Sequence, residues 1–267
     1  MVSRLVAVPL LRVISLGLVC CLGSAGLMAQ TTSGGKKHHK KKKPPISEEA
    51  SPTPQAEETP SAQEESSPVP SSSRKSLAAP DATIAADELV EYSSELPRVK
   101  KLIDSALALT TQGLTYTYGS NDPARGGMDC SGFTSYILQN NGFNDVPRDA
   151  SGQYIWLRKA GTFRAVLSTS PETFELDDLR PGDLLFWMGT TSTEHDPAIT
   201  HTMIYLGTKK GTKHRIMVGS SDGRSYQGQS RWGVSIFDFQ LEAPHLSENN
   251  TLHPRFIGYG RPPGLRD

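Results

Sequence analysis

The sequence predicts an α+β domain that follows a long polar tail. Helical periodicity dominates the stretch from Pro97 to Lys159, and strand-like patterns dominate from Leu184 onward. This order is typical of an α+β arrangement, in which N-terminal helices pack on a C-terminal antiparallel sheet. Residues 31–80 are rich in Lys, Ser, Pro and Glu and poor in large apolar side chains, so we expect them to be disordered. The folded domain is then predicted at 81–267, with its core at about 97–260.

The first 30 residues have the pattern of an export signal. Arg4 and Arg12 precede an apolar run from Val13 to Leu22. Small residues follow the run, and cleavage after Ala29 fits the pattern. The run is shorter than the ~20 residues that a membrane span needs. Two alternatives to a cleaved signal are an uncleaved membrane anchor and lipidation at Cys20 or Cys21. We therefore expect an exported protein of the periplasm, the cell envelope or the extracellular space.

The segment from Gly34 to Pro45 carries six lysines and two histidines in a chain whose net charge is zero. Such a run could hold the protein near an anionic wall polymer or membrane surface, or it could be a solvated spacer. The His pair has no further ligand at a useful spacing, so we expect no metal and no cofactor. Because the chain is exported and has no basic folded domain, nucleic acid is not an expected partner. We expect a monomer.

Four helices are predicted, and one of them begins at Cys130 and ends near Gly142. The other three lie elsewhere in the domain. A short acidic helix is expected at Ile84 to Leu96, a stronger one at Pro97 to Thr111, and another at Ser151 to Lys159. Pro97 suits a first helical turn, and Gly113 is a suitable stop.

Strands are predicted where apolar residues run together or alternate between turn residues. The expected strands are Leu184 to Trp187, Thr200 to Gly207, Arg215 to Val218, Val234 to Phe239 and Arg255 to Tyr259. A polar loop is expected at Met188 to Ile199. We expect the strands to form an antiparallel meander, with a hairpin around Thr208 to Lys213.

The chain is organised around the stretch from Tyr116 to Phe133. Asp129 is a plausible N-cap, which would place Cys130 at the first position of a helix that ends near Gly142. The free N–H groups and the positive end of the helix dipole favour a thiolate there. Cys130 is therefore either an activated nucleophile or a small buried residue.

The number of cysteines favours the first alternative. The chain has three, and two of them lie in the predicted signal. Removal of the signal leaves Cys130 alone, and an unpaired thiol in an exported protein is unusual.

Five motifs together resemble one known group, the NlpC-type cysteine peptidases of bacterial cell walls. They extend over about Pro97 to Gly260, in the order and spacing of that family. The matching residues are Tyr116-x-Tyr118-Gly119, Asp129-Cys130-Ser131-Gly132-Phe133, Val146-Pro147-Arg148 with Gln153, Leu179-x-Pro181-Gly182-Asp183, and His201-x-Met203-Ile204-Tyr205-Leu206-Gly207.

The resemblance implies a papain-like fold and a role for three residues. Cys130 would be the nucleophile, His201 the general base, and Tyr116 a residue that stabilises the oxyanion. Family members cut peptide stems of peptidoglycan, typically between D-γ-glutamate and the next diamino acid. Without the resemblance, His201 fits an ordinary strand histidine and Tyr116 a packing residue.

The chain departs from the family at the third polar residue, which is often His and lies at the end of the next strand. The corresponding position here is Gly219 or Ser220. The imidazole would then be oriented by a serine hydroxyl, by a backbone carbonyl, or by Asp222. We favour Asp222, because a carboxylate also stabilises an imidazolium.

The predicted function is an exported, metal-independent cysteine endopeptidase that acts on peptidoglycan stems. A wall amidase or a transpeptidase with the same Cys–His pair is one alternative. A non-catalytic wall-binding or scaffolding module is another, and the altered third position favours it.

Overall fold

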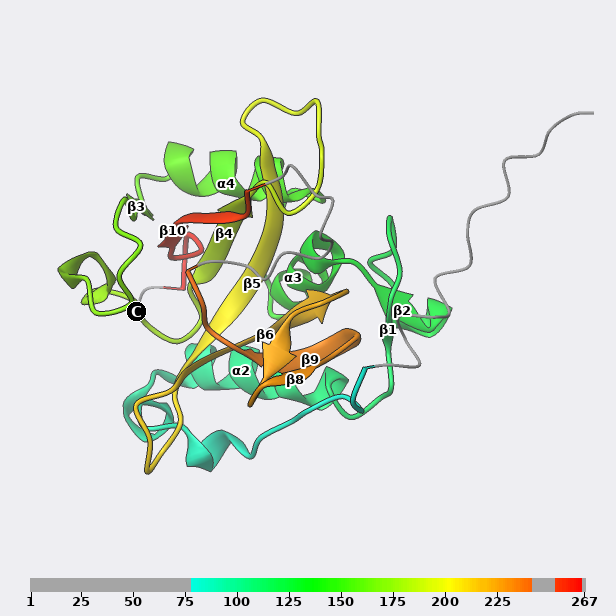
Figure 1. Cartoon of the computed structure of the whole chain (residues 1–267), viewed down its shortest axis with the longest axis vertical. Helices are drawn as coiled ribbons and strands as arrows, with labels where there is room; N and C mark the ends of the chain where they lie inside the picture. The colour runs from blue at the N-terminus through cyan, green and yellow to red at the C-terminus, as the bar shows by residue number, and fades with distance from the viewer. Residues whose placement is uncertain (1–77, 242–252, 266–267) are drawn as a thin grey trace, which may run out of the picture. The chain divides into compact units, whose positions relative to one another are not determined.

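A computed structural model describes residues 78–241 and 253–265 of the 267-residue chain (Figure 1). The predicted signal and nearly all of the predicted linker lie outside these residues. The described part begins with a segment that is paired to the domain. Ala79 donates its N–H to the Ser230 carbonyl at 2.9 Å, and Arg231 donates to the Pro80 carbonyl. The folded part therefore starts before residue 81.

Three α-helices agree with the predicted ones in type and place. They are α2 (Pro97–Leu109), α3 (Cys130–Asn140) and α4 (Ala150–Lys159). Pro97 occupies the first turn of α2, where the missing N–H costs nothing, and Asp149 caps α4 by accepting from the Gly152 N–H at 2.8 Å.

The prediction of a helix at Ile84 to Leu96 is wrong. The segment forms two 3₁₀ turns, η1 (Ala86–Glu88) and η2 (Tyr92–Ser94). Between them Leu89 is fully buried, and the Val90 N–H donates to the Thr208 carbonyl at 2.9 Å. The Glu88 carbonyl also accepts from the Lys210 N–H at 2.8 Å. These two hydrogen bonds to a neighbouring segment replace part of the internal ladder that a helix would have made.

Six strands form one antiparallel sheet in the order β3-β10-β4-β5-β6-β9. Their bounds are β3 (Phe163–Ala165), β4 (Leu184–Met188), β5 (Ile199–Thr208), β6 (Arg215–Ser221), β9 (Gly233–Asp238) and β10 (Arg255–Gly260). The predicted meander holds from β4 to β9, including the β5–β6 hairpin. The last strand crosses back to pair with β4 on its other side, which sequence order alone did not indicate.

Several short elements were not predicted. They are the edge strand β3, the strands β1 (Thr115–Tyr116) and β2 (Gly127–Met128), which pair in parallel, β7 (Ser225–Tyr226) and β8 (Gln229–Ser230), which form a small hairpin, and the 3₁₀ turns η3 (Pro123–Arg125) and η4 (Phe174–Leu176). Elements of two or three residues are too short to show a hydrophobic period.

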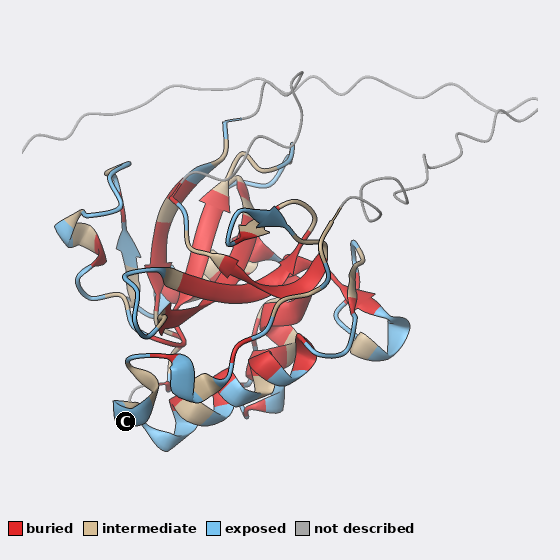
Figure 2. Ribbon diagram, turned by 60° about the horizontal axis from the view of Figure 1, so that its bottom comes forward, coloured by how far each residue is buried: buried red, intermediate tan, exposed pale blue. Residues whose placement is uncertain are grey.

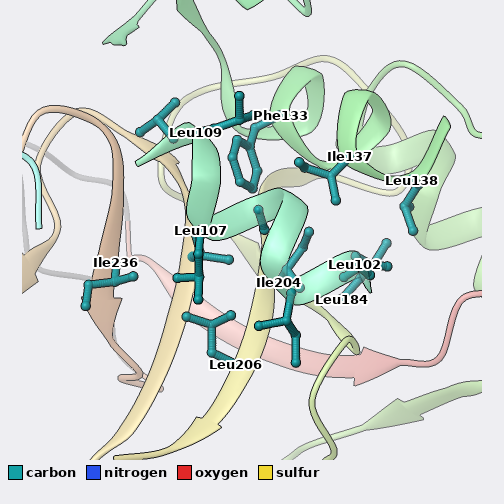
Figure 3. Packing of buried hydrophobic residues seen from close by; sticks show 14 of the residues in the cluster. Leu102, Leu107, Leu109, Phe133, Ile137, Leu138, Leu184, Ile204, Leu206 and Ile236 are labelled. Carbon is teal, nitrogen blue, oxygen red and sulfur yellow. The ribbon is translucent and has the colours of Figure 1, made fainter. Parts of the chain in front are cut away.

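The sheet has an apolar cluster on each face. Apolar side chains of α2 and α3 pack with Leu184, Ile204 and Leu206 of the sheet, as Figure 3 shows. The intervening strand residues, including Leu185, Trp187 and Met203, form a second cluster. Period-two alternation separates these sets. Both faces of the central strands are therefore buried, as the colouring of Figure 2 shows.

This arrangement confirms the predicted fold class, in which helices pack on a mostly antiparallel sheet. Within residues 78–241 and 253–265, none of the helices has the length and hydrophobicity of a membrane span.

Gln153 connects α4 to α3 and to the loop between them. Its side chain is fully buried, and its amide nitrogen donates to the Ser131 and Pro147 carbonyls at 3.0 Å each. Its amide oxygen accepts from the Thr134 hydroxyl at 2.7 Å. The first turn of α3, which carries Cys130, is thereby fixed relative to α4.

Replacement of Gln153 by Ala should lower the free energy of unfolding by about 1–3 kcal/mol, because the buried groups that Gln153 contacts lose their hydrogen-bond partners. The measurement is urea unfolding followed by circular dichroism. Gln112→Ala removes an exposed glutamine and serves as the control, with an expected change within about 0.5 kcal/mol. An equal effect of the two substitutions would show that the buried amide does not hold the helices together.

Candidate active site

Asp129 caps α3 as predicted and does more than cap it. Its carboxylate accepts from the Gly132 N–H and the Gly119 N–H, each at 2.7 Å. The Arg148 guanidinium donates to both carboxylate oxygens, at 3.0 and 2.7 Å. One buried carboxylate thus joins the start of α3 to the loop after β1 and to the segment before α4.

Gly132 is required for close packing at this turn. A Cβ at this position would lie 2.1 Å from the Ser120 carbonyl oxygen and 3.0 Å from the Asn121 Cα, both backbone atoms. The Gly of the Asp-Cys-Ser-Gly motif therefore lets the chain after β1 lie against the first turn of α3.

Cys130 lies at the first position of α3, and it is a buried free thiol. Burial, followed by the Asp129 carboxylate, raises the pKa of its thiol to about 11, although hydrogen bonds from the Thr202 and Ser131 N–H groups lower it. The sequence had predicted a thiolate at this helix start. In the ligand-free structure the loss of hydration is the larger effect, so Cys130 rests as a thiol.

His201 lies on β5 directly opposite Trp187 of β4. Because the Thr202 N–H is hydrogen-bonded to Cys130, the backbone next to His201 lies against the thiol. Burial, followed by the Arg224 charge, lowers the pKa of His201 well below its ordinary value. The resting imidazole is therefore neutral, which is the form that can accept a proton.

Tyr116 is placed beside Cys130 by the short β1–β2 pairing, which sets it opposite Met128. Burial, followed by the charges of Cys130, Asp222 and Asp129, raises the pKa of its phenol. The hydroxyl consequently keeps its proton and remains a hydrogen-bond donor. The Trp232 ring meets Tyr116 edge-on, with 6.3 Å between ring centroids.

The end of β6 shows how the position of the third polar residue is filled. A Cβ on Gly219 would lie 3.0 Å from the Met203 Cγ, so the methionine side chain takes the space beside it. The Ser220 hydroxyl donates to the Met128 carbonyl at 2.6 Å and is engaged there. Asp222 is half-buried, and its charge acts on Cys130, Tyr116 and Arg224.

Arg224 is a residue of this region that the sequence reasoning missed. It is 5% exposed, and its guanidinium lies 4.0 Å from the centroid of the Trp187 ring. It sits between the end of β6 and the short β7, in a Gly- and Ser-rich stretch that carries no periodic pattern. Nothing in that sequence distinguishes it from a surface arginine.

A cleft of about 300 Å³ opens at Cys130. Its lining includes Tyr116, Tyr118, Arg148, Asp149 and, from the predicted loop between β4 and β5, Thr191, Ser192, Thr193 and His195. Tyr118 is 88% exposed, so its ring is available to a ligand. Among the described residues, no three His, Cys, Asp or Glu side chains gather as metal ligands do.

The arrangement suits acyl transfer to a thiol. It provides a sulfur at a helix start, a neutral imidazole on the strand whose backbone lies against that sulfur, a protonated phenol, and the backbone N–H groups that a first helical turn leaves without intrahelical partners.

Comparisons with known proteins agree with the sequence motifs. Residues 113–232 match the model of the NlpC/P60 family, which confirms the predicted resemblance. The probable endopeptidase p60 of Listeria welshimeri is 31% identical over 126 residues, which are 45% of this chain and 20% of that protein. The protein of the same name from Listeria monocytogenes serovar 1/2a is 29% identical over 126 residues, 45% of this chain and 21% of that one. The chain thus matches about a fifth of the length of these curated relatives.

Two solved structures are also similar to this chain. One is an NLP/P60-family protein similar to a lipoprotein, from Staphylococcus aureus subsp. aureus Mu50, with 21% identity, a TM-score of 0.37, and coverage of 63% of this chain and 43% of that one. The other is the NlpC/p60 domain of the peptidoglycan hydrolase SagA, with 23% identity, a TM-score of 0.33, and coverage of 52% and 88%.

The raised pKa of Cys130 gives a prediction for its alkylation by iodoacetamide. Only the thiolate reacts, and below the pKa its fraction grows about tenfold per pH unit. The rate in the native protein should therefore rise steadily from pH 7 to pH 10, measured by mass spectrometry of the Cys130 peptide. The urea-unfolded chain is the control, and its rate should level off about one pH unit above the ordinary thiol pKa of about 8.5. A native rate that levels off below pH 8 would contradict the raised pKa.

Proposed function

We propose that this chain, whose residues 113–232 match the NlpC/P60 family, is an exported cysteine endopeptidase that hydrolyses peptidoglycan stems. The observation that carries the proposal is the position of Cys130, a buried free thiol at the start of α3, beside the peptide that joins His201 to Thr202. The family match and the p60 relatives, which are named probable endopeptidases, support a peptidoglycan hydrolase. A solved relative is named a peptidoglycan hydrolase.

In the proposed first step the Cys130 proton passes to His201 as the sulfur attacks the amide carbon. Transfer during the attack agrees with a resting thiol and a neutral imidazole. The negative charge then rests on the former carbonyl oxygen. The Cys130 N–H and the Tyr116 hydroxyl are the proposed donors to this oxygen.

In the following steps the intermediate collapses, and the C–N bond breaks. His201 returns its proton to the leaving amine, and the acyl group stays on the Cys130 sulfur as a thioester. Water then gives up a proton to His201 and attacks the thioester carbon. Release of the carboxylic acid restores the thiol, so one amide bond and one water are consumed in each turnover.

The proposed bond is the one between D-γ-glutamate and the following diamino acid. The resemblance to the family is the basis of this choice. The cleft agrees with it, because Arg148 and Asp149 bring charges of both signs to its wall, and a stem peptide carries both carboxylates and amines. Tyr118 adds an exposed apolar surface beside them.

Asp222 is the proposed orienting residue of the site, as the sequence suggested. Its charge acts on Cys130, Tyr116 and Arg224. A carboxylate in that position favours any positive charge that the site develops during turnover.

A non-catalytic wall-binding or scaffolding module is the second candidate. The observation in its favour is that Met203 occupies the space beside Gly219, where the family has a polar residue. An amidase or transpeptidase would share the Cys–His chemistry and differ in the bond or the acceptor. The predicted signal and the attraction of the Lys-rich run to an anionic surface concern residues outside those described, and they stay predictions.

Loss of either Cys130 or His201 should abolish turnover of a soluble stem peptide. We expect Cys130→Ala and His201→Ala each to lower kcat by about 10⁴-fold or more, and the double variant to be no worse, because the two residues act as one unit. The assay is chromatography of a synthetic stem peptide. His214→Ala replaces an exposed histidine and should leave the rate unchanged.

Turnover by folded Cys130→Ala at a rate near that of the wild type would end the assignment of Cys130 as nucleophile. A wild-type protein that turns over neither stem peptides nor intact wall would favour the binding module.

A further inference from the structure

Arg224 is a buried cation next to the candidate active site. It is 5% exposed, and its Nη2 has no hydrogen-bond partner among the described residues. Arginine is almost never fully buried unless its charge is compensated, because an unpaired ion loses its hydration. A role in filling space alone would be met at lower cost by a methionine or leucine of similar volume.

The position of Arg224 connects it to His201 through one aromatic ring. Its guanidinium lies 4.0 Å from the centroid of the Trp187 ring, within the range of a cation–π contact. Trp187 lies opposite His201 across the β4–β5 pair, with 5.8 Å between the two ring centroids.

Three polar atoms of this group are buried without partners among the described residues. They are the Trp187 Nε1, the His201 Nε2 and the Arg224 Nη2. An indole N–H and a guanidinium can only donate hydrogen bonds. These two neighbours therefore favour a neutral imidazole over an imidazolium.

Arg224 also interacts with the nucleophile. Burial lowers the pKa of Arg224 and the charges of Cys130 and Asp222 partly offset this effect. The resulting pKa is about 9, so the guanidinium stays charged at neutral pH. The attraction is mutual, since a cation that is stabilised by a thiolate stabilises the thiolate equally. Asp222 in turn supports the charge on Arg224.

Other charged groups at the pair have different effects. Asp129 and Asp222 disfavour the Cys130 thiolate. Arg148 favours it, but its side chain is partly exposed and is paired with Asp129 in a salt bridge of 2.7 Å. Tyr116 is protonated and carries no charge. Among these groups, Arg224 is the buried cation whose charge acts on both Cys130 and His201.

We propose that Arg224 is a positioning residue for the Cys130–His201 pair, whose fixed positive charge stabilises the Cys130 thiolate and keeps His201 neutral between turnovers. It lies between β6 and β7, a few residues after Gly219, which stands where the family would have a third polar residue. The meaning of this role for catalysis rests on the proposed function. The role itself concerns only the ionisation of two side chains.

Substitution of Arg224 tests the proposal without any wall substrate. Arg224→Met keeps an apolar contact with Trp187 and removes the charge, and Arg224→Lys keeps the charge. At pH 8 the alkylation of Cys130 by iodoacetamide, a neutral reagent, should slow by about 10–10³-fold in Arg224→Met, because loss of an adjacent opposite charge shifts a pKa by about 1–3 pH units. Arg224→Lys should stay within about threefold of the wild type. Arg215→Met, which removes a charge from the start of β6, is the matched control and should not change the rate.

A second readout has the opposite sign. An NMR titration of the His201 ring should show a higher pKa in Arg224→Met than in the wild-type protein, since a nearby positive charge has been removed. A merely structural loss would open the site to water. It would then speed alkylation of Cys130, because hydration lowers the pKa of a buried thiol.

Two results would overturn the proposal. One is a folded Arg224→Met protein whose Cys130 reacts as fast as in the wild type, or faster. The other is a failure of Arg224→Met to fold, which would make Arg224 a structural residue. If alkylation slows as expected but the wild-type protein cleaves no stem peptide, the proposed function fails and the role of Arg224 stands.

Discussion

The Asp129 carboxylate receives hydrogen bonds from the Gly119 and Gly132 N–H groups and from both terminal nitrogens of Arg148. These contacts join the loop after β1, the first turn of α3 and the segment before α4, and Cys130 follows Asp129 directly. The position of Cys130 therefore depends on one buried carboxylate whose lone pairs are well satisfied. Such a network is worth more than its separate bonds, because each contact fixes the geometry of the others. Gly132 is part of the same constraint, since a side chain there would collide with the Ser120 backbone.

The same burial that fixes Cys130 also sets its protonation. Taking the thiol and the imidazole out of water disfavours the charged form of each, so the resting pair is neutral. In the proposed mechanism His201 becomes charged when it takes the Cys130 proton, and the surroundings decide how costly that transfer is. The Thr202 and Ser131 N–H groups favour a thiolate, and Asp129 opposes it. A substrate that enters the cleft would change this balance further by displacing water from Tyr116 and Arg148.

The sequence predicted the elements that have a long period or a strong cap. The apolar face of α2, the Asp129 cap and the alternating residues of β5 each carry a local signal, and the structure confirms each of these elements. Contacts between distant segments carried no such signal. The segment around Leu89 joins the end of β5 instead of forming a helix, and β10 crosses to the far side of β4. The protonation of Cys130 was not predictable for a related reason, because its burial depends on what packs over it. Arg224 lies in a turn-rich stretch, and only the fold reveals that it is buried on Trp187.

The central claim is that Cys130 and His201 hydrolyse one amide bond in peptidoglycan stems. Mass spectrometry of purified peptidoglycan incubated with the full-length protein tests this claim most directly. The account predicts fragments that end in γ-linked glutamate and partner fragments that begin with the free amine of the diamino acid, each cut adding one water. These fragments should be missing with the Cys130→Ala protein. Release of whole stems from the glycan, stems rejoined without a gain of water, or the same fragments from Cys130→Ala would contradict the account.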